Sequence, residues 1–235
     1  IEKGGELYRD MPWRDEPSFY NVLVSEIMLQ QTQVPRVLVK FAEFMQIFPT
    51  VDTLAAASLA DVLRAWQGLG YNRRAKYLYE AARYIVIHGE PRTNDELQRL
   101  PGVGSNTAAA IMNYVYQVPT AFVETNIRSV YFYHFFDNNA QVTDKELLAL
   151  VAKTMDYDHP REWFWALMDY GAELKSQGHG RLDMSAQYRK QTPLKGSMRE
   201  VRGQIIKELS YGDQSRSELA VAVDADDRFT SALEC

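Results

Sequence analysis

Hydrophobic residues recur along most of this chain at intervals of three and four positions. In residues 19–33 they are Tyr20, Leu23, Val24, Ile27 and Met28, a spacing that puts them on one face of a helix. The same criterion, with Pro and Gly as breaks, predicts further helices at about 35–47, 52–58, 60–68, 73–88, 94–100, 106–117, 124–136, 144–155 and 160–176. Alternation typical of a strand is confined to residues 120–123. The sequence therefore predicts an all-α protein.

Two of these helices have recognisable starts. Thr93 is followed three residues later by Glu96, which is the arrangement of a capping box. His159-Pro160 puts a proline at the first position of the helix predicted over 160–176, where its missing N–H costs nothing.

The chain changes character after the last of these helices. Residues 179–195 are rich in Gly, Ser, Gln and basic residues, and we interpret them as a long connection. Beyond it, 198–209 is amphipathic and 215–219 resembles the start of a second helix. The pattern predicts a helix-turn-helix-like or winged-helix-like fragment over 196–235. Two C-terminal helices packed on the core would explain it equally well.

Composition narrows the class of protein. With 235 residues, 46% of them hydrophobic, the chain can form one large core or two small ones. No stretch approaches the roughly 20 apolar residues that span a bilayer, and no basic-then-apolar leader is present. We therefore expect a cytoplasmic protein without a membrane partner.

Metal and disulfide chemistry have little support in the sequence. Cys235 is the only cysteine, which excludes a disulfide framework, a thiolate metal site and an iron–sulfur cluster within this chain. The four histidines, His88, His134, His159 and His179, lack the close spacing of a ligand pair on one helix. We expect no metal catalyst.

The distribution of charge matters more than its sum. A net charge of −5 by itself argues against nucleic-acid binding, which needs a basic surface. Between Lys175 and Lys207, however, eight basic residues accompany only Asp183 and Glu200, and the tail beyond is acidic. This basic run permits phosphate contacts, although such runs are usually solvated surface.

The segment from Leu100 to Thr107 reads Leu-Pro-Gly-Val-Gly-Ser-Asn-Thr and separates two predicted helices. Its glycines allow the backbone to approach a ligand closely, and the N-terminus of the following helix attracts anions. Val103 would point inward and join the two helices. The segment therefore fits a site for one DNA phosphate, and it fits equally a helical hairpin that uses Gly only to turn.

Glu26 is the carboxylate that interests us most. Its helical neighbours Val22, Leu23 and Leu29 are apolar, so the carboxyl group lies either at an exposed edge or in an apolar environment. In the second case its pKa would rise and the group would stay protonated, as a general acid requires. A single Glu on a mixed helix is more often a surface residue.

Several segments, in order, resemble the MutY-type adenine DNA glycosylases of the helix-hairpin-helix superfamily. They cover about residues 11–175 and comprise Met-Pro-Trp-Arg at 11–14, Val-Ser-Glu-Ile-Met-Leu-Gln-Gln-Thr-Gln-Val at 24–34, Phe-Pro-Thr at 48–50, Ala-Trp-Gln-Gly-Leu-Gly-Tyr-Asn-Arg-Arg-Ala at 65–75, the segment 100–107, and Ala-Leu-Met-Asp-Tyr-Gly-Ala at 166–172. The Leu-Gln-Gln-Thr string is the strongest mark of the MutY-type branch.

The resemblance implies a role for individual residues. Glu26 would protonate a flipped base, Gln30 and Gln31 would wedge into the duplex, and Tyr71 would press from the opposing side. Arg73 would bind DNA as well. The hairpin would hold the DNA backbone through Gly102, Val103, Gly104, Ser105 and Thr107.

The fold that the resemblance implies has two helical lobes. The first is a six-helix barrel over 19–123. The second comprises 1–18 and 124–195 and lacks an iron–sulfur cluster, and the fragment 196–235 follows. DNA with a damaged or mismatched base is the expected partner of a monomeric enzyme.

Three positions depart from the family pattern. Glu124 stands where the family has an aspartate that steadies the sugar cation, although Asn126 matches the family's asparagine. Asn106 stands where lyase members carry a lysine, and an amide cannot form a Schiff base. Lys175 falls at the first of four cluster cysteines, none of which is present. We expect no cofactor, with room only for a monovalent cation at the hairpin, and infer that basic residues in 175–195 supply phosphate contacts instead.

Three hypotheses for the function remain. The first is a monofunctional glycosylase that removes adenine opposite 8-oxoguanine or guanine, with Glu26, Glu124, Asn126 and Asn106 at its catalytic centre. The second is a mismatch glycosylase for thymine or uracil opposite guanine. The third is a catalytically weak protein that binds damaged DNA.

Overall fold

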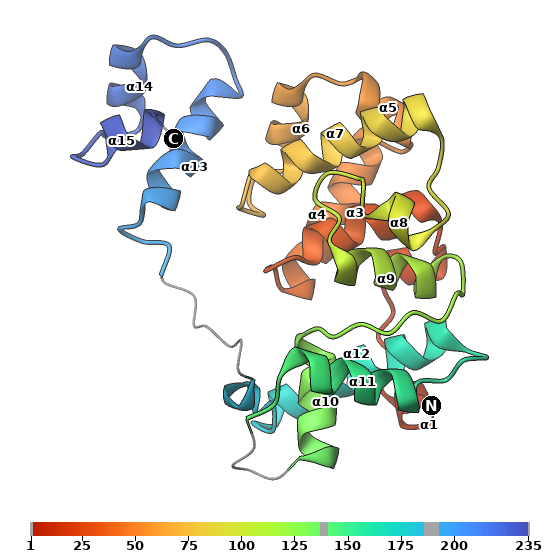
Figure 1. Cartoon of the computed structure of the whole chain (residues 1–235). Coiled ribbons are helices and arrows are strands. Elements are labelled where there is room, and N and C mark those ends of the chain that lie inside the picture. Colours follow the sequence, from red (N-terminus) through yellow and green to blue (C-terminus); the bar gives the residue numbers. More distant parts are fainter. Residues whose placement is uncertain (1, 137–140, 186–192, 235) are drawn as a thin grey trace. The chain divides into compact units, whose positions relative to one another are not determined.

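The computed structural model describes residues 2–136, 141–185 and 193–234 (Figure 1). Within these ranges the chain is helical, and its only strand-type pairing is an isolated bridge between Val142 and Ser185. The predicted all-α class is confirmed. The α-helices are α1 (Glu2–Glu6), α2 (Pro12–Asp15), α3 (Phe19–Leu29), α4 (Val34–Ile47), α5 (Val51–Ala56), α6 (Leu59–Ala65), α7 (Arg73–His88), α8 (Asn94–Leu97), α9 (Ser105–Tyr114), α10 (Thr125–Phe135), α11 (Asp144–Thr154), α12 (Pro160–Ser176), α13 (Met198–Leu209), α14 (Arg216–Ala222) and α15 (Phe229–Leu233), with a 3-10 turn, η1, at Leu182–Met184.

The helices belong to two compact units. Unit 1 comprises Ile1–Glu26, Arg92–Arg99 and Val103–Lys190, and unit 2 comprises Ile27–Pro91, Leu100–Gly102 and Gln191–Cys235. The three domain boundaries predicted from the sequence stay predictions. Of the basic run, Arg189 and Lys190 lie outside the described residues, as does Cys235. In the part of the chain that is described, no helix is long and apolar enough to cross a membrane.

Local sequence signals explain where many helices begin. The predicted capping box at α8 is present. The Thr93 hydroxyl accepts a hydrogen bond from the backbone N–H of Glu96, and the Glu96 carboxylate accepts one from the backbone N–H of Thr93. The predicted proline start of α12 is confirmed as well. The run 120–123 is not a strand because the side chain of Asn113 in α9 bonds both backbone groups of Thr120, at 2.7 and 3.1 Å. That amide holds the segment as an extended connection.

Unit 1 is built around the packing of α10 against α12. Phe122 and Phe164 pack as a tilted pair with ring centroids 4.7 Å apart, and Tyr114 meets Phe122 edge to face. Gly171 makes the close approach possible, because a Cβ there would lie 2.2 Å from the backbone oxygen of Asn126.

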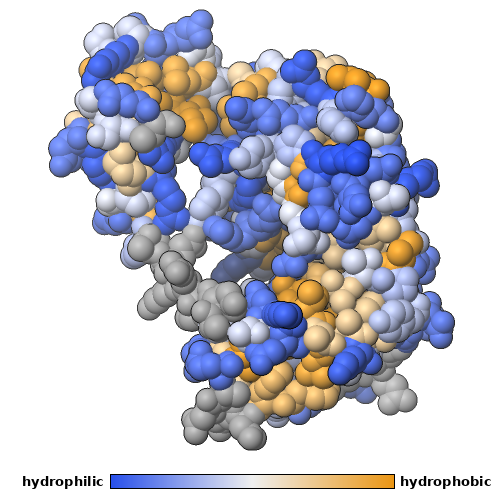
Figure 2. Space-filling model, viewed as in Figure 1, coloured by the Kyte–Doolittle hydropathy of each residue, from blue (hydrophilic) through white to orange (hydrophobic). Residues whose placement is uncertain are grey.

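Unit 2 contains the four helices α4–α7, which enclose a core around Trp66. Phe44 packs against both Trp66 and Phe48, with centroid distances of 6.1 and 5.0 Å. Leu54 and Leu78 join α5 and α7 and are fully buried. Hydrophilic residues cover most of the visible face of these helices, with a few hydrophobic ones among them (Figure 2).

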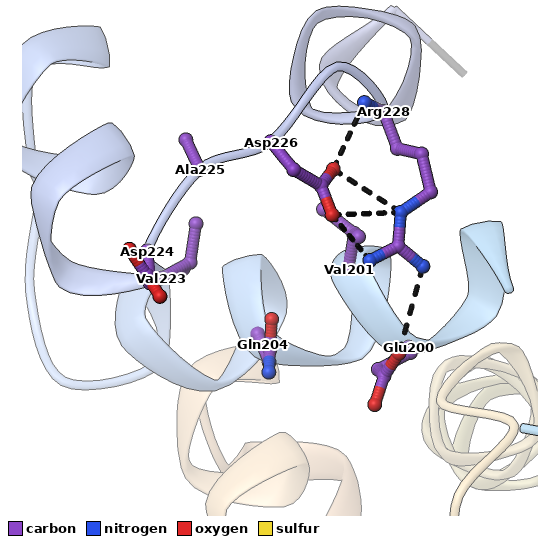
Figure 3. Close-up of a pocket in the computed structure, with 8 residues that line it drawn as sticks. All are labelled: Glu200, Val201, Gln204, Val223, Asp224, Ala225, Asp226 and Arg228. Carbon is purple, nitrogen blue, oxygen red and sulfur yellow. Dashed lines mark hydrogen bonds and ion pairs between the residues drawn. The ribbon is translucent and has the colours of Figure 1, made fainter. Parts of the chain in front are cut away.

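The C-terminal helices α13–α15, also in unit 2, form a cluster with a core of its own. Its buried side chains are Val201, Ile205, Leu219, Val223, Phe229 and Ala232. Arg228 closes the cluster by pairing with Asp226 and with Glu200 of α13, and Figure 3 shows how these groups line a pocket. Because Arg228 and the two carboxylates bind one another there, we assign these charged groups a role in stabilising the cluster and not in binding a ligand. The sequence predicted two helices here, and the structure has a third, α15.

We expect Gly171→Ala to destabilise the protein by about 3 kcal/mol, since the added methyl group would meet backbone and not a movable side chain. Urea denaturation measures the loss. Gly5→Ala in α1 is the matched control, because a Cβ at Gly5 meets nothing within 4 Å. Equal unfolding free energies for the two variants would contradict the close packing of α10 on α12.

Candidate active site

An ion pair in the interior of unit 1 anchors the site. Arg14 in α2 donates to both carboxylate oxygens of Asp169 in α12, at 2.7 and 3.0 Å, and both residues are buried. Arg9 adds a third charged bond of 2.6 Å to the same carboxylate. The guanidinium of Arg14 also lies 5.2 Å from the ring of Trp165. These contacts fix the N-terminal segment on α12.

Glu26 on α3 carries an abnormal carboxyl group. Loss of solvation raises its pKa to about 8, the charge of Glu124 adds to the rise, and Arg14 opposes it. The side chain is only partly exposed. At neutral pH the group is therefore protonated and can donate its proton.

Glu124 lies at the N-cap of α10. Its Oε1 accepts hydrogen bonds from the N–H groups of Asn126 at 2.6 Å and of Ile127 at 3.1 Å. Burial raises the pKa of the carboxyl group, while these two bonds and the charges of Lys175 and Arg128 act in the opposite direction. Bonds accepted from N–H donors favour the ionised form. The environment of Glu124 thus combines burial, which favours the neutral carboxyl group, with N–H donors and cations, which favour the carboxylate.

Two further polar groups of unit 1 lie close to these carboxyl groups. Asn126 points its Nδ2 toward Oε2 of Glu124 at 3.5 Å, and its Oδ1 is buried without a hydrogen-bond partner among the described residues. A buried carbonyl oxygen without a partner can accept a bond from a ligand. Tyr114, buried at the end of α9, has a pKa raised well above its usual value by burial and by the charge of Glu26.

The hairpin segment turns between α8 and α9. Gly102 has a φ of 80°, and a Cβ there would lie 2.9 Å from that of Tyr77, so only glycine fits. Gly104 is the N-cap of α9 without a side-chain cap bond, and Gly104, Ser105 and Asn106 are exposed.

Gly104 has no side chain that could cap the first N–H groups of α9, an arrangement that suits an anion. Val103 and Thr107 are buried beneath this end of α9. The side chain of Asn106 donates to the carbonyl of Val123 at 2.6 Å. That bond ties the start of α9 to the residue before Glu124.

In unit 2, Arg74 organises the other predicted residues. Its buried guanidinium donates to five backbone carbonyls and a hydroxyl. The acceptors are the carbonyl oxygens of Ile27, Met28, Gln30, Leu69 and Gly70 and Oγ1 of Thr32. Because these acceptors come from the end of α3 and from the turn before α7, one side chain holds the two segments together.

The predicted DNA-contacting residues of unit 2 include Gln30, Gln31, Tyr71 and Arg73, which lie in or next to the two segments that Arg74 joins. Gln31 and Tyr71 are both exposed and have left-handed backbones, with φ of 57° and 51°. Gln30 donates to the carbonyl of Gly102 at 3.2 Å, and Arg73 is exposed in the first turn of α7.

The predicted residues thus fall into two sets. Those in unit 1 are Glu26, Val103, Gly104, Ser105, Asn106, Thr107, Glu124 and Asn126, and those in unit 2 are Gln30, Gln31, Tyr71, Arg73 and Gly102. Their roles stay predictions.

Sequence reasoning missed Arg14, Asp169, Tyr114 and Arg74. Three of the four stand inside the quoted motifs, and a charged residue within an apolar motif is the signal that could have found them.

The residues present do not fit an iron–sulfur cluster, which needs four thiolates, because the sequence holds one cysteine. Among the described residues, no group of three or more His, Cys, Asp or Glu side chains is arranged to hold a metal ion.

Comparison with known proteins places this geometry in a family. A model of the HhH-GPD superfamily of base excision DNA repair proteins matches residues 24–154. The chain is 47% identical over 128 residues to an adenine DNA glycosylase of Mycolicibacterium smegmatis, covering 52% of this chain and 43% of the relative. It is 38% identical over 181 residues to the adenine DNA glycosylase of Homo sapiens, covering 71% of this chain and 33% of the relative. The chain therefore spans less than half the length of these two relatives.

Solved structures agree on the fold. A thermostable thymine-DNA glycosylase superposes with a TM-score of 0.62 at 25% identity, covering 73% of this chain and 83% of that one. An endonuclease III bound covalently to DNA superposes with a TM-score of 0.57 at 20% identity, covering 67% of this chain and 73% of that one. With the family model matched from Val24 to Thr154 and the hairpin in place between α8 and α9, this chain belongs to the HhH-GPD superfamily of base excision DNA repair proteins.

Proposed function

We propose that this protein is a DNA N-glycosylase that removes adenine mispaired with 8-oxoguanine or guanine. The observation that carries the proposal is the protonated Glu26, with a pKa of about 8, beside Glu124 in the matched region. The adenine specificity is supported by the names of the relatives at 47% and 38% identity.

The proposed reaction uses the two carboxyl groups in different protonation states. Glu26 gives its proton to a ring nitrogen of the flipped base, and the electron pair of the N-glycosidic bond leaves with the base. Positive charge then develops on the sugar, and the reaction requires Glu124 as a carboxylate there to stabilise it. The resulting Glu26 carboxylate takes a proton from the water whose oxygen bonds to the sugar carbon, so the acid is regenerated.

Duplex DNA with a damaged or mismatched base is the proposed partner, bound by a monomer associated with the nucleoid. The N-terminus of α9, with glycine at its N-cap, suits one phosphate. Exposed Gln31, Tyr71 and Arg73 suit the duplex around the flipped base. We also propose that the enzyme acts without an iron–sulfur cluster or other cofactor, and a monovalent cation at the hairpin is compatible with this.

A second candidate is the removal of thymine or uracil opposite guanine. It is favoured by the superposition on a thymine-DNA glycosylase, because this chain covers 83% of that protein. A panel of duplexes with A, T, U, hypoxanthine and alkylated bases tests both proposals. Release of thymine faster than adenine would replace the first proposal with the second, and tight binding of abasic-analogue DNA without any release would overturn both.

We expect Glu26→Gln to slow adenine release by at least about a hundredfold, since an amide has no proton to give. Single-turnover cleavage of an A:8-oxoguanine duplex measures the rate. Glu43→Gln is the control, because Glu43 forms only an exposed pair with Lys40. Equal rates in Glu26→Gln and wild type would refute the role of Glu26.

The rate of base release should fall as the pH rises through about 8, by about tenfold per unit above it. The reason is that the pKa of Glu26 is raised, so the donating form exists below this value and is lost above it. Single-turnover rates from pH 5 to 10 give the profile. A rate that stays constant between pH 7 and 10 would rule out a proton donor with this pKa.

The enzyme should remove the base without cutting the strand, because Asn106 offers no amine for a Schiff base. Borohydride treatment during turnover should trap no covalent complex. Should trapping occur, the proposal is wrong, and Lys175→Met would show whether the Lys175 amine, half-buried at the end of α12, is the nucleophile.

A further inference from the structure

Within unit 2, α13 packs on α6 and on the turn that carries Tyr71. Ser210, at the end of α13, accepts from Arg64 through its carbonyl and from Gln67 through its hydroxyl, the latter at 3.3 Å. At the other end of the helix, Nη1 of Arg199 donates to the hydroxyl of Tyr71 at 2.5 Å. Both ends of α13 are thus held by hydrogen bonds, and the partner at the N-terminal end is Tyr71.

The ring of Tyr71 contacts two guanidinium groups. Those of Arg74 and Arg199 each lie 5.5 Å from the ring centroid, within the range of a cation–π interaction. Arg74 is immobilised by its backbone acceptors. Arg199 is the second cation and also donates to the Tyr71 hydroxyl. It therefore constrains both the ring and the hydroxyl of Tyr71.

Tyr71 needs such support because of its backbone. With a φ of 51° it occupies the left-handed region, which costs a residue other than glycine about 1 kcal/mol or more. The residue is also 36% exposed, so solvent covers part of its side chain. Contacts to the hydroxyl and the ring therefore decide its orientation.

Charge argues against α13–α15 being a DNA-binding module by itself. Residues 193–235 contain six Lys and Arg against eight Asp and Glu, and a module that attracts phosphates needs a basic excess. The helices also lie outside the region that the family model matches. Their influence on DNA binding has to act through the residues that they contact.

We propose that Arg199 is a positioning residue for Tyr71, and that the C-terminal helices serve to hold this tyrosine in the orientation in which it meets the duplex. The proposal rests on the proposed function in taking Tyr71 as a DNA contact. It gives α13–α15 a part in DNA binding through Tyr71.

The first test needs no DNA. In Arg199→Ala, hydrogen exchange of peptides that cover residues 66–74 should be about threefold faster than in wild type. Lys207→Ala, which removes one charge from an exposed position of the same helix, should leave these peptides unchanged. Identical exchange in Arg199→Ala and wild type would overturn the proposal.

The second test uses single-turnover base release. Arg199→Ala and Tyr71→Phe, which keeps the ring and removes the hydroxyl, should each slow release by about fivefold, and the double variant should be no slower than the slower single one. Arg199→Lys keeps a cationic donor and should recover part of the rate, while Lys207→Ala should match wild type. Additive losses, or faster release in Arg199→Ala, would overturn the proposal, the latter by showing that Arg199 restrains Tyr71 from DNA.

The two tests separate this inference from the proposed function. If wild type releases no base while Arg199→Ala accelerates exchange in residues 66–74, the glycosylase proposal fails and the positioning contact stands. If wild type releases adenine and Arg199→Ala changes neither exchange nor rate, the glycosylase proposal stands and the inference fails.

Discussion

The guanidinium of Arg74 is the constraint on which the arrangement of unit 2 depends. It is buried, and its bonds reach the last carbonyls of α3 and those of Leu69 and Gly70. Carbonyls at a helix end that are shielded from water need such a donor, because leaving one unpaired costs about 1–3 kcal/mol. The same side chain stacks on Trp66. One residue therefore ends α3, shapes the turn of Tyr71 and ties both to the core.

Unit 1 obtains its chemistry from a balance of buried charges. Asp169 neutralises Arg14 with two short bonds, so Arg14 can lower the pKa of Glu26 only in part. Burial and Glu124 outweigh it, and the pKa of Glu26 comes to about 8. An unpaired Arg14 at the same place would favour an ionised Glu26. The ion pair with Asp169 thus allows Arg14 to be buried near Glu26 while Glu26 stays protonated.

The sequence was sufficient for the features that depend on neighbours in the chain. Helix spacing and the capping box at Thr93 were predictable because their partners are three or four residues apart. The pairs Arg14–Asp169 and Arg199–Tyr71 were not, since 155 and 128 residues separate their members and no local pattern records such a contact. The third helix of the C-terminal cluster was missed for a related reason. Its core positions, Phe229 and Ala232, acquire a meaning only when α13 and α14 pack on them.

Glu124 shows how a departure from a family pattern can preserve an electrostatic arrangement. Aspartate is favoured at an N-cap because its short arm reaches the second and third N–H groups of the helix. Glu124 reaches the same two groups with Oε1 despite its extra methylene. The carboxylate therefore stays at the positive end of α10, where the helix favours its charged form. Oε2 makes a long contact to Asn126. The longer side chain thus still places one carboxyl oxygen on the first N–H groups of α10.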